Sequence, residues 1–289
     1  MSWAAHEFEN YFIQKHAGVK ASFIAIAVGT SLPDFFTKKF VYSAANPPQF
    51  HRGFPGIGFT HSFLFGCVFA LIALGVFRSR TWAIGILLGQ WAHVITDSCD
   101  TAGVMPFFPF STEPLTIGMW KHAAVVGRHG DAAAYYSSLG GVWDFFWFVM
   151  VVLFARSVLR ADYFRTVVMP TDQRAWSALR RWLRLSDRGL LVLYRGYFIY
   201  GFARMVSWFL YARFEVRTPF EPWWGAPSWV KANDLSDASA VEMVLRTLAG
   251  GVLFAAFVWL CWRLFVQKLW RRAGELRVSD TSPAPAIAD

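Results

Sequence analysis

Charged residues are scarce in this chain. Only 16% of its 289 residues are charged, whereas 55% are hydrophobic and 18% are aromatic. Ordinary soluble domains carry about 25% charged residues, and the mean hydropathy here is +0.35. A soluble domain of this length has too small an interior to bury so much apolar surface. The composition excludes an ordinary soluble protein and indicates an integral membrane protein.

Cysteine is scarce as well, and its placement excludes two kinds of site. The three cysteines lie in apolar stretches at Cys67, Cys99 and Cys261, with no C-x-x-C pair. This pattern predicts neither a disulfide framework nor a thiolate metal site. The N-terminus lacks a basic region followed by a short apolar run, so we expect no signal peptide.

Apolar segments are abundant, and six are long enough, or nearly so, to cross a hydrocarbon core of about 30 Å. The predicted spans are 17–32, 59–77, 82–101, 142–159, 190–212 and 244–266. The first is short enough to be a re-entrant segment. Lipid leaves an open strand no partners for its backbone, so the spans are expected to be helical. The predicted fold is an all-α polytopic membrane bundle of five to six helices.

Lysine and arginine predict the orientation of this bundle. Basic clusters lie at 78–80, 156–188 and 268–277, and all three fall on one side if the chain crosses at every span. We therefore expect an N-in, C-in protein with these clusters in the cytoplasm. The net charge of +9 is then positive-inside charge attracted to anionic headgroups, and no nucleic-acid partner is expected. The stretch 174–188 predicts an amphipathic helix on the inner surface.

We expect four parts along the chain. Residues 1–159 form a membrane-embedded core that carries the chemistry, and 160–189 form a basic amphipathic linker. Residues 190–272 form a C-terminal helix pair with an outer loop. Residues 273–289, which contain Pro283 and Pro285, are predicted to be disordered.

Ionisable side chains inside apolar spans are costly, so each one is a candidate for function. In the third span His93 and Asp97 are four residues apart, which places both on one face of a helix. An imidazole and a carboxylate that converge in this way can bind a divalent cation. The alternative is a buried His–Asp hydrogen bond that fixes helix packing.

Three further groups are expected on the same side of the membrane as Asp97. Asp34 ends the first span, whereas His51 and His61 lie at the start of the second. Crossing parity sends all of them to the non-cytoplasmic face, where they would meet Asp97. Each has a structural alternative: a helix-terminus carboxylate for Asp34, a loop residue for His51 and an interfacial or capping histidine for His61.

The ordered motifs L-P-D, H-R-G, T-H-S and H-x-x-x-D, followed by A-G-V and P-F, span about 31–110. This series resembles the YdjM-like family of predicted inner-membrane metal-dependent hydrolases, which is similar, more remotely, to zinc-dependent phospholipase C. The resemblance implies a metal site at the inner membrane. The implied metal ligands are Asp34, His51, His61, His93, Asp97 and, near the N-terminus, His6. It also implies that Arg52 lines the site beside His51.

The chain departs from the family pattern at two places. Phe35 and Phe36 follow Asp34 where the family has an acidic residue and a histidine, and five extra residues separate H-R-G from T-H-S. The first departure removes ligands for a second metal. His122, His129 or Asp144, all expected on the same face, are candidates to join the site; the alternative is a solvated loop with incidental histidines.

Histidine and carboxylate ligands favour Zn²⁺, with Mn²⁺ or Fe²⁺ as alternatives. The expected activity is hydrolysis, in which a metal-activated water attacks an ester or phosphoester of a lipid-like substrate at the outer membrane interface. Asp97 or Asp100 would accept the proton, and His51 or Arg52 would stabilise the developing negative charge. Two other functions stay open: an ion- or proton-coupled transporter that uses His93 and Asp97 as a relay, and a metal-stabilised scaffold without turnover. The expected partners are membrane lipids and the substrate.

Overall fold

The computed structural model describes residues 5–40, 59–99, 103–111, 113–119 and 138–214, with seven isolated positions between 252 and 267. These residues are helical apart from loops and one isolated antiparallel bridge between Val104 and Leu115. The long helices are α1 (Ala5–His16), α2 (Phe23–Phe40), α3 (Phe63–Phe77), α4 (Arg80–Asp97), α7 (Leu139–Val158), α10 (Gln173–Leu183) and α11 (Asp187–Phe214). Short turns η2 (Phe59–His61), α8 (Ala161–Tyr163), η3 (Phe164–Val168) and α9 (Met169–Thr171) lie between them. The prediction of an all-α fold is confirmed for the described residues.

Helices α3 and α4 form an antiparallel hairpin with a two-residue connection. Ser62 caps α3 by accepting a hydrogen bond from the backbone N–H of Phe65, and Ser79 caps α4 through the N–H of Trp82. Between the helices Arg78 adopts a left-handed backbone conformation with φ 50°, and its backbone N–H donates a hydrogen bond to the carbonyl of Leu74. These local signals end one helix and start the next within two residues.

Helix α2 packs so closely on α4 that only glycine fits at the contact. A Cβ added to Gly89 would lie 2.5 Å from the carbonyl oxygen of Ile26, and one added to Gly29 would lie 2.5 Å from that of Ile86. Small residues let two helix backbones approach in this way, as is common in membrane helix pairs. The close approach positions the backbone of α2 beside the last turns of α4.

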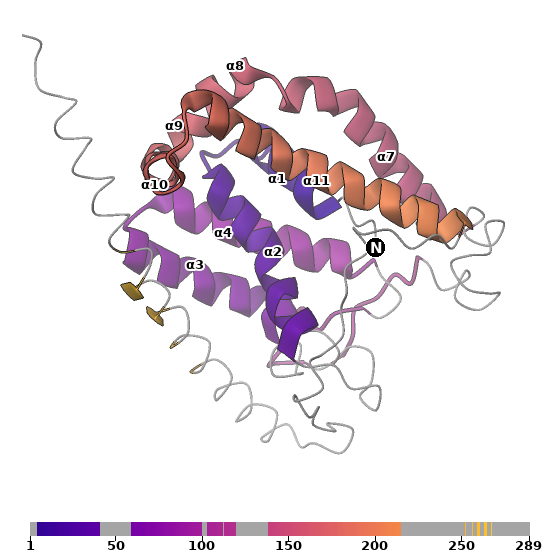
Figure 1. Cartoon of the computed structure of the whole chain (residues 1–289). Helices are drawn as coiled ribbons and strands as arrows, with labels where there is room; N and C mark the ends of the chain where they lie inside the picture. The colour runs from indigo at the N-terminus through magenta and orange to yellow at the C-terminus, as the bar shows by residue number, and fades with distance from the viewer. Residues whose placement is uncertain are drawn as a thin grey trace, which may run out of the picture.

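Helix α1 lies between two layers of helices (Figure 1). It contacts α2 and α4 on one side and α7 and α11 on the other. Its apolar residues Phe8 and Tyr11 join a core with α7, η3, α10 and α11, whereas α2, α3 and α4 share a second core. Its polar residues reach both layers: Asn10 donates to the hydroxyl of Tyr197 in α11 and accepts from Thr30 in α2.

The first predicted span, 17–32, is wrong in its limits. The structure places a break there, because Gly18 has φ +67° and the next helix begins only at Phe23. The hydroxyl of Ser22 accepts from the N–H of Ala25 and caps this helix. Helix α2 then continues through Pro33 to Phe40, so Asp34 lies within a helix and does not end one.

One helix among the described residues, α7, is long and apolar enough to cross a membrane. Its 20 residues measure about 30 Å at 1.5 Å per residue, which matches a hydrocarbon core. The apolar stretches Phe23–Pro33 and Phe63–Phe77 are shorter. The sixth predicted span is described only at isolated positions, and the tail 273–289 lies outside the described residues. Six crossings and the N-in, C-in orientation therefore stay predictions.

The starts of α2, α4 and α10 are bound together at one end of the molecule. Ser22 donates its hydroxyl to Asp172, just before α10, and donates its backbone N–H to Thr81 at the start of α4 over 3.0 Å. Asp172 also accepts from the N–H of Ile24 at 3.0 Å. Two of the basic clusters, at 78–80 and in α10, therefore share one end of the molecule, while their cytoplasmic location stays a prediction.

Asp172 is expected to make stability depend on pH. Burial raises the pKa of its carboxyl from 3.8 to about 6, although the hydrogen bonds from Ser22 and Ile24 oppose the shift. Because the folded pKa is raised, the contribution to stability is complete below about pH 4 and is lost as pH rises through about 6. In a series of melting curves from pH 4 to 8, the melting temperature of Asp172→Asn should rise relative to that of wild type as the pH increases. Asp162→Asn, an exposed carboxylate in α8, is the control and should show no such trend.

Candidate metal centre

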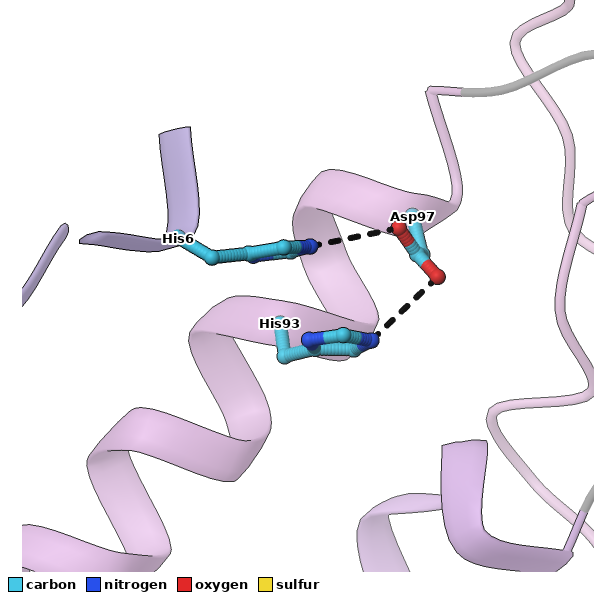
Figure 2. A group of neighbouring side chains, drawn as sticks. All are labelled: His6, His93 and Asp97. Atoms are coloured by element: carbon cyan, nitrogen blue, oxygen red, sulfur yellow. Dashed lines mark ion pairs between the residues drawn. The ribbon is translucent and has the colours of Figure 1, made fainter. Parts of the chain in front are cut away.

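Four buried side chains from three segments meet beside the end of α4. His93 and Asp97 come from the last turns of that helix, His61 ends η2, and His6 lies in the first turn of α1. Asp97 is 1% exposed, His61 and His93 are 0% exposed and His6 is 6% exposed. Figure 2 shows His6 and His93 as stacked rings that point toward Asp97. Their ring centroids are 4.0 Å apart. One atom from each of His6, His93 and Asp97 lies within 4.8 Å of the others.

All three histidines direct Nε2 toward the Asp97 carboxylate. The distances to Oδ2 are 3.3 Å from His93 and 3.4 Å from His61, and the distance from His6 to Oδ1 is 3.6 Å. The Nε2 atoms of His61 and His93 are 3.3 Å apart. These two nitrogens and Oδ2 therefore form a nearly equilateral triangle. A tetrahedral ion with ligand bonds of about 2.0–2.1 Å separates its ligand atoms by about 3.3–3.4 Å, so the triangle has the size of one face of such a site.

The other nitrogen of each ring is hydrogen-bonded away from Asp97. Nδ1 of His93 donates to the carbonyl of Thr30 at 2.7 Å, and Nδ1 of His6 donates to the carboxylate of Glu9 at 3.2 Å. Nδ1 of His61 lies 3.2 Å from the hydroxyl of Thr60. Outer partners of this kind fix the orientation and tautomer of metal-binding histidines.

These hydrogen bonds determine whether Nε2 of each ring carries a proton or a lone pair that can bind a metal ion. A carbonyl only accepts, so a neutral His93 carries its proton on Nδ1 and a lone pair on Nε2. The same holds for His6, since its Nδ1 faces a carboxylate. Two lone pairs 3.3 Å apart, on His93 Nε2 and Asp97 Oδ2, repel unless a cation lies between them. The donor set therefore fits a divalent metal ion.

Protonation is the alternative source of positive charge. Burial by itself lowers the pKa of His6, but the carboxylates of Glu9 and Asp97 outweigh it and raise that pKa from 6.5 to about 10. The pKa of Glu9 is lowered, because the positive charge and hydrogen bonds of its neighbours outweigh the opposing effect of burial. A metal ion bound here has to replace a proton.

Two residues of the surrounding shell hold these segments in place. The side-chain amide of Gln90, one turn before His93, donates to the carbonyls of Thr60 and Ser62 at 3.0 and 2.9 Å. Gln90 thereby fixes η2, and with it His61, against α4. Thr96 donates its hydroxyl to Glu9, which in turn holds His6.

Sequence reasoning missed Glu9, Thr30, Gln90 and Thr96. A signal for Glu9 was present, because His6 and Glu9 are three residues apart and thus on one face of a helix. Gln90 is a buried amide within an apolar segment and could have been found by the rule that found His93. The backbone carbonyl of Thr30 leaves no signal in a sequence.

The remaining sequence-predicted residues are not brought together by any contact described. Asp34 lies in α2, but its side chain is outside the described residues, as are His51, Arg52, Asp100, His122 and His129. Asp144 lies in the first turns of α7. The roles predicted for these residues stay predictions.

Residues 4–163 match the family model of the YdjM inner membrane protein. The match covers more than half of the chain and spans all four residues of the candidate centre, so the chain belongs to the YdjM inner membrane protein family. The resemblance seen in the motifs is thereby confirmed, whereas the remoter similarity to phospholipase C stays a prediction. Neither the curated proteins nor the solved structures contain a match to the chain.

Glu9 is expected to tune metal affinity without binding the ion. Glu9→Gln keeps an acceptor for Nδ1 of His6 but removes the charge, and loss of such an outer partner lowers affinity about 10–100-fold. Competition titration with a chromophoric zinc chelator would measure the change. Glu7→Gln is the matched control, because Glu7 is also buried in α1 but packs against Gly201 of α11. Equal zinc affinity in wild type and Glu9→Gln would contradict this role.

Proposed function

We propose that this protein is a membrane-bound, metal-dependent hydrolase that cleaves an ester or phosphoester of a lipid-like substrate at the membrane interface. The observation that carries the proposal is the convergence of three Nε2 atoms on Asp97, with distances of 3.3 to 3.6 Å. Membership of an inner membrane family supports a substrate that is itself found in membranes.

A divalent cation, Zn²⁺ in the first instance, would supply Lewis acidity and an activated water. His61, His93 and the Oδ2 atom of Asp97 would hold it, and His6 would complete the set from α1. Glu9 and Thr30 keep the ring nitrogens of His6 and His93 turned toward the site. Asp97 is engaged by three histidines, which favours Asp100 as the proton acceptor. His51 and Arg52 are the proposed groups for the developing negative charge, on the basis of the motifs.

The test is hydrolysis of bis(p-nitrophenyl) phosphate and p-nitrophenyl butyrate by detergent-purified protein, before and after chelation and after zinc is restored. We expect turnover of one of these probes that chelation abolishes, zinc restores and His93→Ala lacks. His16→Ala, an exposed histidine at the end of α1, should keep full activity. Bound zinc without turnover of either probe would favour the scaffold, and a proton flux in liposomes that survives chelation would favour the relay.

A further inference from the structure

A second feature, separate from the metal centre, is a cleft of about 230 Å³ between α7 and α11. All of its lining side chains are apolar. Val151, Ala155 and Val158 come from α7, Phe198 and Phe202 come from α11, and Phe8 of α1 also lines it. Pockets for compact small molecules measure about 300–1,000 Å³ and include a few polar groups. This cleft is smaller and has no polar group, so it suits a hydrocarbon chain.

The cleft has a buried floor and an exposed rim. Phe8, Val158 and Phe198 are at most 2% exposed, whereas Ile199 is 57% and Phe202 is 39% exposed. The neighbouring surface of α7 is apolar too, with Leu153 65% exposed. A membrane protein presents such surfaces to acyl chains, which are the only abundant material that can fill an apolar cleft on that surface.

Arginine side chains lie at one end of the cleft. Arg195 is one turn before Ile199 on α11, and its Nε donates to the carbonyl of Leu159, a cleft residue, at 2.9 Å. Arg156 and Arg160 are exposed at the same end of α7, where Asp162 offsets part of their charge by pairing with Arg160 at 3.3 Å. A guanidinium group binds phosphate oxygens in a planar, two-pronged manner. The end of an apolar cleft is where a lipid headgroup emerges.

We propose that this cleft binds one acyl chain of an anionic phospholipid and that Arg195 contacts the lipid phosphate, with Arg156 and Arg160 adding positive charge around the headgroup. The site is separate from the metal centre, because the two use different faces of α1. Phe8 lines the cleft, whereas His6 points toward Asp97 of α4. Bound lipid would join α7 to α11 and thereby stabilise the layer that supports α1.

Native mass spectrometry of detergent-purified protein with added phosphatidylglycerol or phosphatidylcholine tests this site. We expect wild type to retain one phosphatidylglycerol and to show a higher melting temperature with it. Ala155→Phe places a ring in the cleft and should reduce the lipid-bound fraction about tenfold. Val152→Phe adds the same ring to the exposed face of the same helix, outside the cleft, and should bind as wild type does.

Arg195→Gln tests the contact with the lipid headgroup independently of the contact with the acyl chain. It should reduce retention of phosphatidylglycerol about fivefold, as expected for one arginine near an anionic headgroup, and leave phosphatidylcholine unchanged. Equal retention by Ala155→Phe and Val152→Phe would overturn the proposal. A second result would also overturn it: wild type is a dimer in light scattering, Ala155→Phe is a monomer, and the two retain equal amounts of lipid. The occupant of the cleft would then be a second copy of the chain.

Discussion

Replacing Asp97 by asparagine is expected to remove metal from the protein while leaving its fold intact. The asparagine side chain has the shape of aspartate but lacks the charge that faces three imidazole nitrogens at 3.3 to 3.6 Å. Loss of an outer partner alone costs about 10–100-fold in affinity, so loss of this ligand should cost more than about 100-fold. Elemental analysis should find close to one zinc per chain in wild type and almost none in Asp97→Asn.

Two controls distinguish loss of the metal ligand from a general loss of structure. Asp162→Asn, exposed and far from the centre in sequence, should retain the metal content of wild type. The melting temperature of Asp97→Asn in the presence of a chelator should stay close to that of chelated wild type, because a protonated His6 keeps the Glu9 carboxylate at 3.2 Å after the Asp97 charge is removed. A chelated Asp97→Asn protein that melts well below chelated wild type would indicate a structural role for this carboxylate.

Replacing Gly89 by leucine is expected to have the largest effect on the fold. The added Cβ would lie 2.5 Å from the carbonyl oxygen of Ile26 and 3.1 Å from the amide nitrogen of Thr30, so α2 has to move away from α4. Overpacking usually costs about 1–3 kcal/mol, and backbone atoms cannot give way as a side chain can. The shift would also withdraw the carbonyl of Thr30 from His93, so metal affinity should fall together with stability.

Gly89→Ala is the milder variant, in case the leucine variant does not fold. It should still lower both the melting temperature and the affinity for zinc. Gly75→Leu is the matched control, because nothing lies within 4 Å of a Cβ built at Gly75 in α3. A Gly89→Leu protein with the melting temperature and zinc affinity of Gly75→Leu would show that the close approach of α2 and α4 does not position the site.

The sequence predicted which ionisable side chains lie together better than it predicted the limits of the helices. The spacing of His93 and Asp97, and the expectation that His61 lies near Asp97, both follow from helix geometry and from the cost of burying ionisable groups. The structure brings these three together with His6, for which the family resemblance was the only guide. Glu9 was missed because its partner His6 lies in a helix that no apolar window detects.

The helix limits were harder to predict because a hydropathy window averages over breaks. Residues 17–32 are apolar enough to look continuous, yet Gly18 and the cap at Ser22 interrupt them. The packing of α2 against α4 was also missed, although G-I-L-L-G at 85–89 is the small-residue pattern of close helix pairs. The carbonyl of Thr30 and the joining of Asp172 to α2 depend on tertiary structure and leave no local signal.

We propose above that His61, His93 and Asp97 bind a divalent ion and that His6 completes the set. Zinc-edge X-ray absorption of the loaded protein tests it most directly, because multiple scattering from imidazole reports how many histidines are bound. We expect three imidazoles and two oxygen ligands, one from Asp97 and one from water, at about 2.0–2.2 Å, with one imidazole fewer in His61→Ala. A spectrum with oxygen ligands alone, or one that His61→Ala leaves unchanged, would contradict binding of the ion by these histidines.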